Sequence, residues 1–127
     1  MKIYLAARFS RGAEMREIRD RLAGHEVTSR WINLRDGDYP KYSAETLNSD
    51  PQSFSAYAET DIADIHAADT IVSFTGGGGK GGRHVEFGLG IALGKRLVVI
   101  GPREHVFHTL PQVEQYPDLE SFLLEET

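Results

Sequence analysis

The sequence contains no cysteine among its 127 residues, which excludes disulfide bonds, thiolate nucleophiles and cysteine metal sites. It also lacks an excess of basic side chains: the formal net charge is -5, so no basic face is available to neutralise the phosphates of a long nucleic acid. No apolar run approaches the length of a membrane span, and no secretion-type leader opens the chain. We therefore expect a cytoplasmic protein without nucleic-acid or membrane partners, whose substrate is a small molecule.

The five histidines are scattered without a zinc-type spacing, so no metal site is expected. With 40% hydrophobic residues the chain can form one sizeable core, and we expect a single domain over residues 1–127. Short apolar or β-rich runs are typical of strands, and they occupy residues 2–7, 25–32, 69–75, 95–101 and 113–116. Segments with helical spacing or helix-start signals alternate with these runs, at residues 10–24, 50–68, 83–94 and 118–125.

This alternation of strands and helices predicts a three-layer α/β fold of the flavodoxin or Rossmann-like type, with helices on both faces of a five-stranded parallel sheet. The expected strand order is 2-1-3-4-5. Ligands of such sheets bind beyond the carboxyl ends of the strands, at the switch point between the first and third strands. This geometry places residues 7–12 and 75–86 in one crevice, while the polar stretch 33–50 is interpreted as a long loop that acts as a lid or binding segment.

A glycine-rich segment over residues 76–82 follows the third predicted strand and precedes a helix. Bare backbone amides and the helix dipole at such a junction can hold an anion. The segment lacks the Gly-Lys-Ser/Thr ending of a P-loop and the dinucleotide fingerprint after the first strand, so ATP hydrolysis and hydride transfer are poor interpretations. A flexible surface loop without function is the alternative.

Glu86 is predicted to lie in the first turn of the next helix, where the helix dipole favours an ionised carboxylate that can attack an electrophilic sugar carbon. An ordinary helix-start residue is the alternative. Asp61 shares a helix face with Asp64 and Tyr57, and for Asp64 a solvated surface position is expected. Tyr4 lies in the first strand, where its ring is suited to the core and its hydroxyl to fixing a nearby catalytic carboxylate.

Three segments, KIYLAARFSRG, DIADIHAADTIVSF and GGRHVEFGLGIALGKRLVVIG, give the chain its resemblance to a known family. It resembles the nucleoside 2-deoxyribosyltransferases and the related 2'-deoxynucleoside 5'-monophosphate N-hydrolases. The family's catalytic glutamate falls on Glu86, a family aspartate on Asp61 and the tyrosine that bonds the nucleophile on Tyr4. The resemblance implies a retaining displacement without metal or organic cofactor, in which Glu86 attacks C1', Asp61 protonates or orients the base, and Tyr4 holds Glu86.

The resemblance leaves hydrolysis and base transfer open. Many transferases have an aspartate where this chain has Lys80, and they supply an asparagine-containing tail where this chain ends in DLESFLLEET. A homodimer or larger assembly active in nucleotide salvage is implied. Cationic and hydroxyl side chains are available for a 5'-phosphate, namely Arg8, Ser10, Arg11, Lys80 and Arg83. The other expected substrate contacts are Ala7, Phe9, Gly78, Gly79 and Gly82.

Two further interpretations remain. A phosphoribohydrolase of the cytokinin-activating type also has a glycine-rich loop followed by glutamate, although its Pro-Gly-Gly-x-Gly-Thr sequence is missing here. A nucleotide-binding or sensing module without turnover is the non-enzymatic alternative. Phe9 and Trp31 are candidates to stack on a base, with core or dimer packing as the alternative for Trp31. His84 is interpreted as either a base contact or a surface residue.

Overall fold

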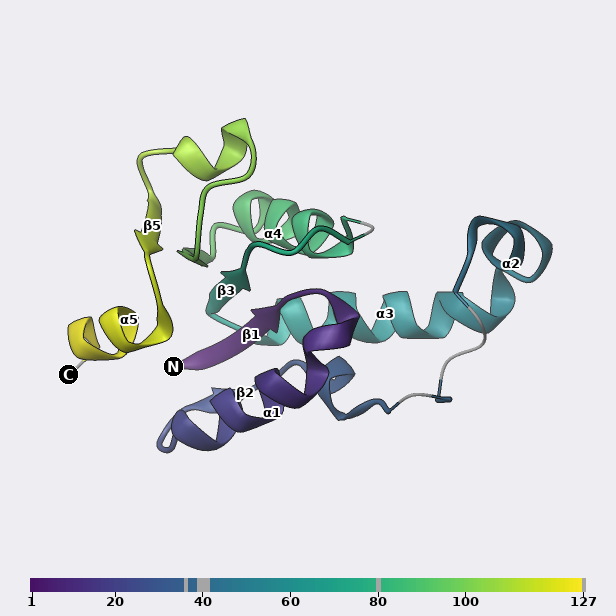
Figure 1. Cartoon of the computed structure of the whole chain (residues 1–127), viewed down its shortest axis with the longest axis horizontal. Coiled ribbons are helices and arrows are strands. Elements are labelled where there is room, and N and C mark those ends of the chain that lie inside the picture. The colour runs from purple at the N-terminus through teal and green to yellow at the C-terminus, as the bar shows by residue number, and fades with distance from the viewer. Residues whose placement is uncertain (36, 39–41, 80, 127) are drawn as a thin grey trace.

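The protein is described here by a computed structural model that covers residues 1–35, 37–38, 42–79 and 81–126. Its sheet has five parallel strands in the order β2-β1-β3-β4-β5, which confirms the predicted architecture (Figure 1). The strands are β1 (Lys2–Ala6), β2 (Glu26–Val27), β3 (Thr70–Phe74), β4 (Arg96–Ile100) and β5 (Val113–Tyr116). Because all five strands run parallel, their carboxyl ends lie at the same edge of the sheet.

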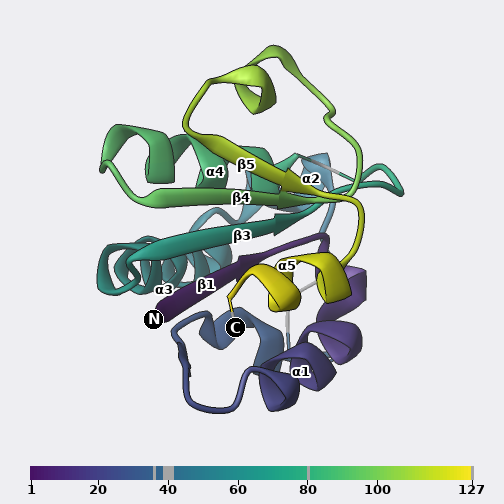
Figure 2. The same cartoon turned by 90° about the vertical axis from the view of Figure 1, so that its left-hand side faces the viewer.

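Helices cover both faces of the sheet, with α3 and α4 on one face and α1 and α5 on the other (Figures 1 and 2). The α-helices are α1 (Gly12–Arg21), α2 (Ala44–Ser49), α3 (Gln52–Ala67), α4 (Gly82–Ala92) and α5 (Leu119–Glu125). Short 3-10 turns are η1 (Phe9–Arg11), η2 (Arg30–Asn33) and η3 (Val106–Thr109). None of the helices in the described part of the chain is long and apolar enough to span a bilayer.

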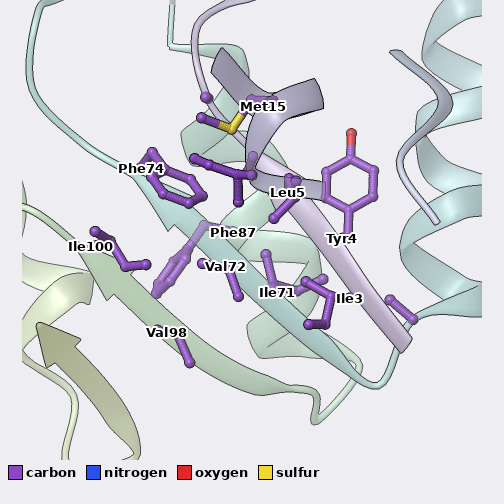
Figure 3. Close-up of a cluster of buried hydrophobic side chains, with 14 of the residues drawn as sticks. Ile3, Tyr4, Leu5, Met15, Ile71, Val72, Phe74, Phe87, Val98 and Ile100 are labelled. Atoms are coloured by element: carbon purple, nitrogen blue, oxygen red, sulfur yellow. The ribbon is translucent and has the colours of Figure 1, made fainter. Parts of the chain in front are cut away.

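The register of the central strands decides which side chains share a face. Tyr4 lies beside Ile71, which lies beside Leu97, so these three side chains point toward α3 and α4. Leu5 and Val72 point to the opposite face, and Figure 3 shows part of the core that these strands build. A buried strand with apolar residues on both faces is what a doubly wound parallel sheet requires.

Gly90 allows α4 to lie close to the sheet. A Cβ atom at this position would lie 2.7 Å from Ile71 Cγ1 and 3.0 Å from Leu97 Cδ2, closer than side-chain packing permits. Glu86 is one helical turn before Gly90 and therefore lies on the same side of the helix. The missing side chain at Gly90 thus brings the carboxylate of Glu86 down toward the sheet.

The predicted strand over residues 25–32 is wrong for most of its length, because β2 has only two residues and η2 follows. Tertiary packing explains this difference: Trp31 and Ile32 are buried, and Trp31 Nε1 donates a hydrogen bond to the Leu5 carbonyl at 2.7 Å. That bond anchors a compact turn against β1. Trp31 is therefore a core residue, one of the alternatives that the sequence left open.

The predicted long loop over residues 33–50 contains a helix, α2, which begins with a capping box between Ser43 and Thr46. Ser10 does not cap α1, because η1 continues into that helix and Arg11 takes the capping position. Asp50 ends α2 and accepts a hydrogen bond from the Ser53 hydroxyl, while Pro51 is the residue that precedes α3. The remaining predicted helices and strands are confirmed to within a few residues of their ends.

Candidate active site

Tyr4 and Glu86 form a hydrogen-bonded pair at the centre of the α3/α4 face. The hydroxyl of Tyr4, on β1, donates to Glu86 Oε2, on α4, although the two residues are 82 positions apart in the sequence. Tyr4 is fully buried. Burial, and then the nearby charges of Glu86 and Asp61, raise the pKa of Tyr4, so the phenol remains protonated and acts as a donor.

Glu86 lies in the second turn of α4 rather than the first, so its predicted position is corrected. The helix begins at Gly82, after Gly81 has turned the chain with a φ of 89°. Glu86 is therefore beyond the turn where the helix dipole acts most strongly. Burial dominates instead and raises the pKa of Glu86 to about 8; the Tyr4 hydrogen bond opposes this rise and the charge of Asp61 adds to it.

Asp61, on α3, is the second carboxyl group near Tyr4. Burial raises the pKa of Asp61 to about 6, with a further contribution from Asp64 and an opposing one from Arg30. A carboxyl group with a raised pKa can hold a proton near neutral pH and donate it to a leaving group. Asp61 also lines a pocket of about 170 Å³, together with Arg30, Trp31, Leu34, Tyr57 and Thr60.

The expectation that Asp64 is a solvated surface residue is wrong, since it is only 5% exposed. Its carboxylate accepts hydrogen bonds from the backbone N–H and from Nε of Arg30, each at 2.9 Å. These bonds compensate the burial of the charge. They also fix the Arg30 guanidinium at the rim of the pocket that Asp61 lines.

The loops after β1 and β3 lie side by side, as the predicted crevice requires. Arg8, after β1, donates from Nη1 to the carbonyl of Gly77, after β3. A Cβ atom at Gly77 would lie 3.0 Å from Arg8 Nη1, and one at Gly79 would lie 3.1 Å from Arg83 Nη1, so glycine permits this approach. Gly77 and Gly79 also have positive φ angles, of 84° and 116°, that other residues rarely adopt.

The side chain of Arg83 holds the glycine loop in place. Its guanidinium is only 5% exposed and donates to the carbonyl of Gly78 at 2.7 Å and to Glu104 Oε1 at 3.0 Å. The other carboxylate oxygen of Glu104 accepts the backbone N–H of Gly76 at 3.2 Å. An oxyanion thus already lies against an amide of the loop, which shows that this backbone can bind one.

The other predicted substrate contacts surround the same edge of the sheet. Ser10 is exposed, Phe9 packs against Trp31 with their ring centroids 6.4 Å apart, and Arg11 forms an ion pair with Glu14 at 2.8 Å. Three more predicted contacts are Ala7, which is buried, and Gly79 and Gly82, which are exposed. Lys80 lies outside the described residues. Their contacts with a substrate stay predictions.

The spacing of the histidines gave no sign of a cluster that the fold creates. His84 on α4 and His105 and His108 beside η3 have ring nitrogens that all lie within 4.8 Å of one another. His84 is thus neither a simple surface residue nor adjacent to the pocket that Asp61 lines. Burial, and then the neighbouring rings, lower the pKa of His108 to about 4. No local sequence pattern indicates this cluster, because His84 and His105 are 21 positions apart in the sequence.

The fold and the Tyr4–Glu86 pair together define a flavodoxin-like α/β domain with two half-buried carboxyl groups, Glu86 and Asp61, near Tyr4. No family model and no curated protein matches the sequence. Among solved structures, the chain is similar to the CMP N-glycosidase BcmB of Clostridium botulinum, with a TM-score of 0.60 and 20% sequence identity. The match covers 99% of this chain and 98% of that chain, and it confirms the predicted fold.

Proposed function

We propose that this protein cleaves the N-glycosidic bond of a nucleoside or deoxynucleoside 5'-monophosphate, with Glu86 as the nucleophile. The observation that carries the proposal is the hydrogen bond from the buried Tyr4 to the half-buried Glu86, next to the second carboxyl group, Asp61. This geometry supports the roles that we propose, with Glu86 as nucleophile, Tyr4 as the donor that holds it and Asp61 as proton source. The similar fold of a CMP N-glycosidase supports both parts of the proposal, the cleavage of an N-glycosidic bond and the nucleotide class of substrate.

In the reactive form the one proton that the two carboxyl groups share is on Asp61, so Glu86 is a carboxylate. In the first step this carboxylate attacks C1' of the sugar, and the bond from C1' to the base nitrogen breaks. The base leaves with the electron pair of that bond and takes a proton from Asp61. In the second step water attacks C1' of the glycosyl ester, Glu86 leaves as a carboxylate, and the proton of the water returns to Asp61. Neither step needs a group beyond the side chains and the substrate.

The substrate would lie across the carboxyl edge of the sheet. The base would occupy the pocket lined by Trp31, Tyr57 and Asp61, with Arg30 at the rim. The 5'-phosphate would bind the glycine loop, whose backbone N–H at Gly76 donates to a carboxylate oxygen of Glu104 in the free protein. Arg8 and Ser10 flank this position from the loop after β1.

Hydrolysis is the favoured fate of the ester, because the neighbour in fold is an N-glycosidase. The test is incubation with panels of nucleosides and 5'-monophosphates, with and without a free base as acceptor, followed by chromatography of the released base. We expect release from a monophosphate without acceptor. Release only with an acceptor would assign a transferase instead.

The variant Glu86→Gln separates an enzyme from a binding module, since it removes the nucleophile and keeps a hydrogen-bond acceptor for Tyr4. The matched control is Glu59→Gln, an exposed glutamate on α3. We expect the first variant to bind the nucleotide without releasing base and the control to behave like the wild type. If the wild type bound the nucleotide without releasing base, the protein would be a nucleotide-binding module and not an enzyme.

We further propose that residues 1–127 work as one domain and assemble as a homodimer or larger oligomer. The resemblance to the deoxyribosyltransferases supports assembly, and the match in fold over nearly the whole chain supports a single unit. Light scattering of the purified chain measures the assembly directly. A monomer at the concentrations used in the activity assay would refute this part of the proposal.

A further inference from the structure

A second group of chemically active side chains lies on the side of α4 away from Asp61. His84 is the third residue of α4, while His105 precedes η3 and His108 lies within it. The rings of His105 and His108 have centroids 3.7 Å apart, and the ring of Phe87 packs against His108 at 4.9 Å. Two segments that are distant in the sequence therefore converge on three imidazoles.

The separation of two of these nitrogens matches that of two ligands on one metal ion. His84 Nδ1 lies 3.1 Å from His105 Nε2. Ligands held about 2.0–2.1 Å from a tetrahedral ion lie roughly 3.3 Å apart. His84 Nδ1 and His105 Nε2 are thus spaced as neighbouring ligands, and an ion beside them would accept both lone pairs once the proton that joins them in a hydrogen bond has moved to His105 Nδ1.

Glu104 supplies the outer partner that metal-bound histidines usually have. Its Oε1 atom lies 3.5 Å from His84 Nε2, which favours the tautomer with its proton on Nε2 and a lone pair on Nδ1. The same carboxylate pairs with Arg83, so the nearest fixed positive charge is already compensated. Local charge therefore does not oppose a cation here.

Two nitrogen atoms of the cluster are buried and have no hydrogen-bond partner among the described residues, namely His105 Nδ1 and His108 Nε2. His108 is only 1% exposed. Buried polar atoms are normally paired, and those that are not call for an explanation such as a bound ion. The unpaired nitrogen of His108 belongs to a ring that lies within reach of both His84 and His105.

We propose that His84, His105 and His108 bind a late first-row divalent cation such as Zn²⁺, with a fourth position open to water. His84 and His105 already have the spacing of ligands, and His105 provides its lone pair when its ring proton moves from Nε2 to Nδ1. His108 accepts the backbone N–H of Glu104 at Nδ1, at 3.0 Å, so its Nε2 carries the ring proton without metal. It becomes the third ligand when that amide contact is released and the proton moves to Nδ1.

The cation would join η3 to the start of α4, two residues before Glu86. Glu104 extends this connection to the glycine loop through its bonds to Gly76 and Arg83. The site therefore braces the carboxyl edge of the sheet without contacting the substrate. Its readouts are metal affinity and thermal stability, which do not depend on the proposed N-glycosidase activity.

The test is calorimetric titration of the untagged full chain with Zn²⁺, after removal of metals with a chelator, together with the melting temperature with and without Zn²⁺. We expect one ion per chain, a raised melting temperature, and no comparable effect of Mg²⁺, which prefers oxygen ligands. His84→Ala and His105→Ala should each weaken binding at least about 10-fold, and Glu104→Gln about 10-fold. His66→Ala, an exposed histidine on α3, is the matched control and should bind like the wild type.

Unchanged affinity in His105→Ala, or a loss shared equally by His66→Ala, would overturn the site. Titration of the wild type with Co²⁺ avoids variants that do not fold. A tetrahedral Co²⁺ absorption spectrum in the visible range supports the site, whereas the weak spectrum of hydrated Co²⁺ refutes it.

Discussion

On the sheet face covered by α1 and α5, Glu14 and Glu114 form ion pairs with arginine, whereas Glu86 and Asp61, on the face covered by α3 and α4, are half-buried and form no ion pair among the described residues. Glu14 pairs with Arg11 at 2.8 Å, and Glu114 pairs with Arg96 at 2.7 Å. These partners lower the pKa of both carboxyl groups. Glu86 and Asp61 have the opposite shift, because burial raises the pKa of each.

This difference distinguishes carboxylates that form ion pairs from the candidate catalytic carboxyl groups. A carboxylate with a guanidinium partner is satisfied and unreactive, and in solvent it adds little to stability. A buried carboxyl group without a basic partner costs stability, and such groups concentrate at sites of catalysis. The two faces therefore differ in the property that a catalytic site needs.

Glu86→Gln should give the largest effect on activity. If Glu86 is the nucleophile, base release should fall by on the order of 10³-fold or more, because the covalent step is lost. Glu14→Gln, on the opposite face, should leave turnover unchanged. Single-turnover chromatography of the released base measures both. Equal activity of the two variants would remove Glu86 from the mechanism.

Asp61→Asn should lower base release by about 100-fold, the range of a lost general acid. The pKa values of about 8 for Glu86 and about 6 for Asp61 belong to a coupled pair that must hold one proton. The wild type should therefore be most active between about pH 6 and 8. Asp61→Asn should instead gain activity with rising pH, as Glu86 alone ionises.

Asp20→Asn, an exposed aspartate on α1, is the matched control for the acid and should keep the bell-shaped profile. Some substrates have a base that is methylated at a ring nitrogen and leaves without needing a proton. With such a substrate, Asp61→Asn should lower base release less. If the pH profile of base release remained bell-shaped in Asp61→Asn, the proton donated to the base would come from another group.

Tyr4→Phe should lower activity at neutral pH by about 10-fold. The Tyr4 hydroxyl lowers the pKa of Glu86 by donating to it, so its removal raises that pKa further and leaves less of the nucleophile ionised. The loss should shrink as pH rises, since Glu86 then ionises without help. A loss that is constant with pH would instead indicate a packing defect.

The strands and helices that carry this candidate site could be predicted from the sequence, because strands and helices have distinct periods, and a family motif marked Glu86 as the candidate nucleophile. Residues 69–75 and 95–101 read as buried strands, and they form β3 and β4. Tyr4 and Asp61 are also near Glu86, as the resemblance implied, although their roles stay predictions.

Other features depend on contacts between distant segments and have no local signal. In the sequence, Asp64 cannot be distinguished from an exposed helix residue, because its partner Arg30 is in η2, far away along the chain. The histidine cluster needs α4 and η3 to converge, and Trp31 needs the Leu5 carbonyl of β1 to fix its turn. Helix starts were also uncertain by a residue: α4 begins at Gly82 instead of residue 83, which moves Glu86 from the first turn into the second.

Glu86→Gln should also change stability in a pH-dependent way. Unfolded Glu86 ionises near pH 4.5, whereas the folded chain keeps it protonated up to about pH 8, so the folded state holds the extra proton between these values. The stability of the wild type therefore falls as pH rises through this window. The variant, which cannot ionise, should equal the wild type below pH 4.5 and exceed it above pH 8 by at least about 1 kcal/mol.

Urea unfolding at pH 4 and at pH 8.5 measures this effect. Glu59→Gln, which is exposed, should show no such difference between the two pH values. A Glu86→Gln variant that is less stable than the wild type at the higher pH would mean that the carboxylate is well compensated in the fold. The contrast between the two faces would then be lost.

The smallest effect should come from the ion pair between Arg21 and Glu120, which joins α1 to α5 on the opposite face. Both side chains are largely exposed, at 48% and 65%, so water and salt screen their attraction. Glu120→Gln should change the free energy of unfolding by less than about 1 kcal/mol and leave base release unchanged. The difference should vanish in high salt, and a larger, salt-independent loss would show that this face, too, depends on a specific charge.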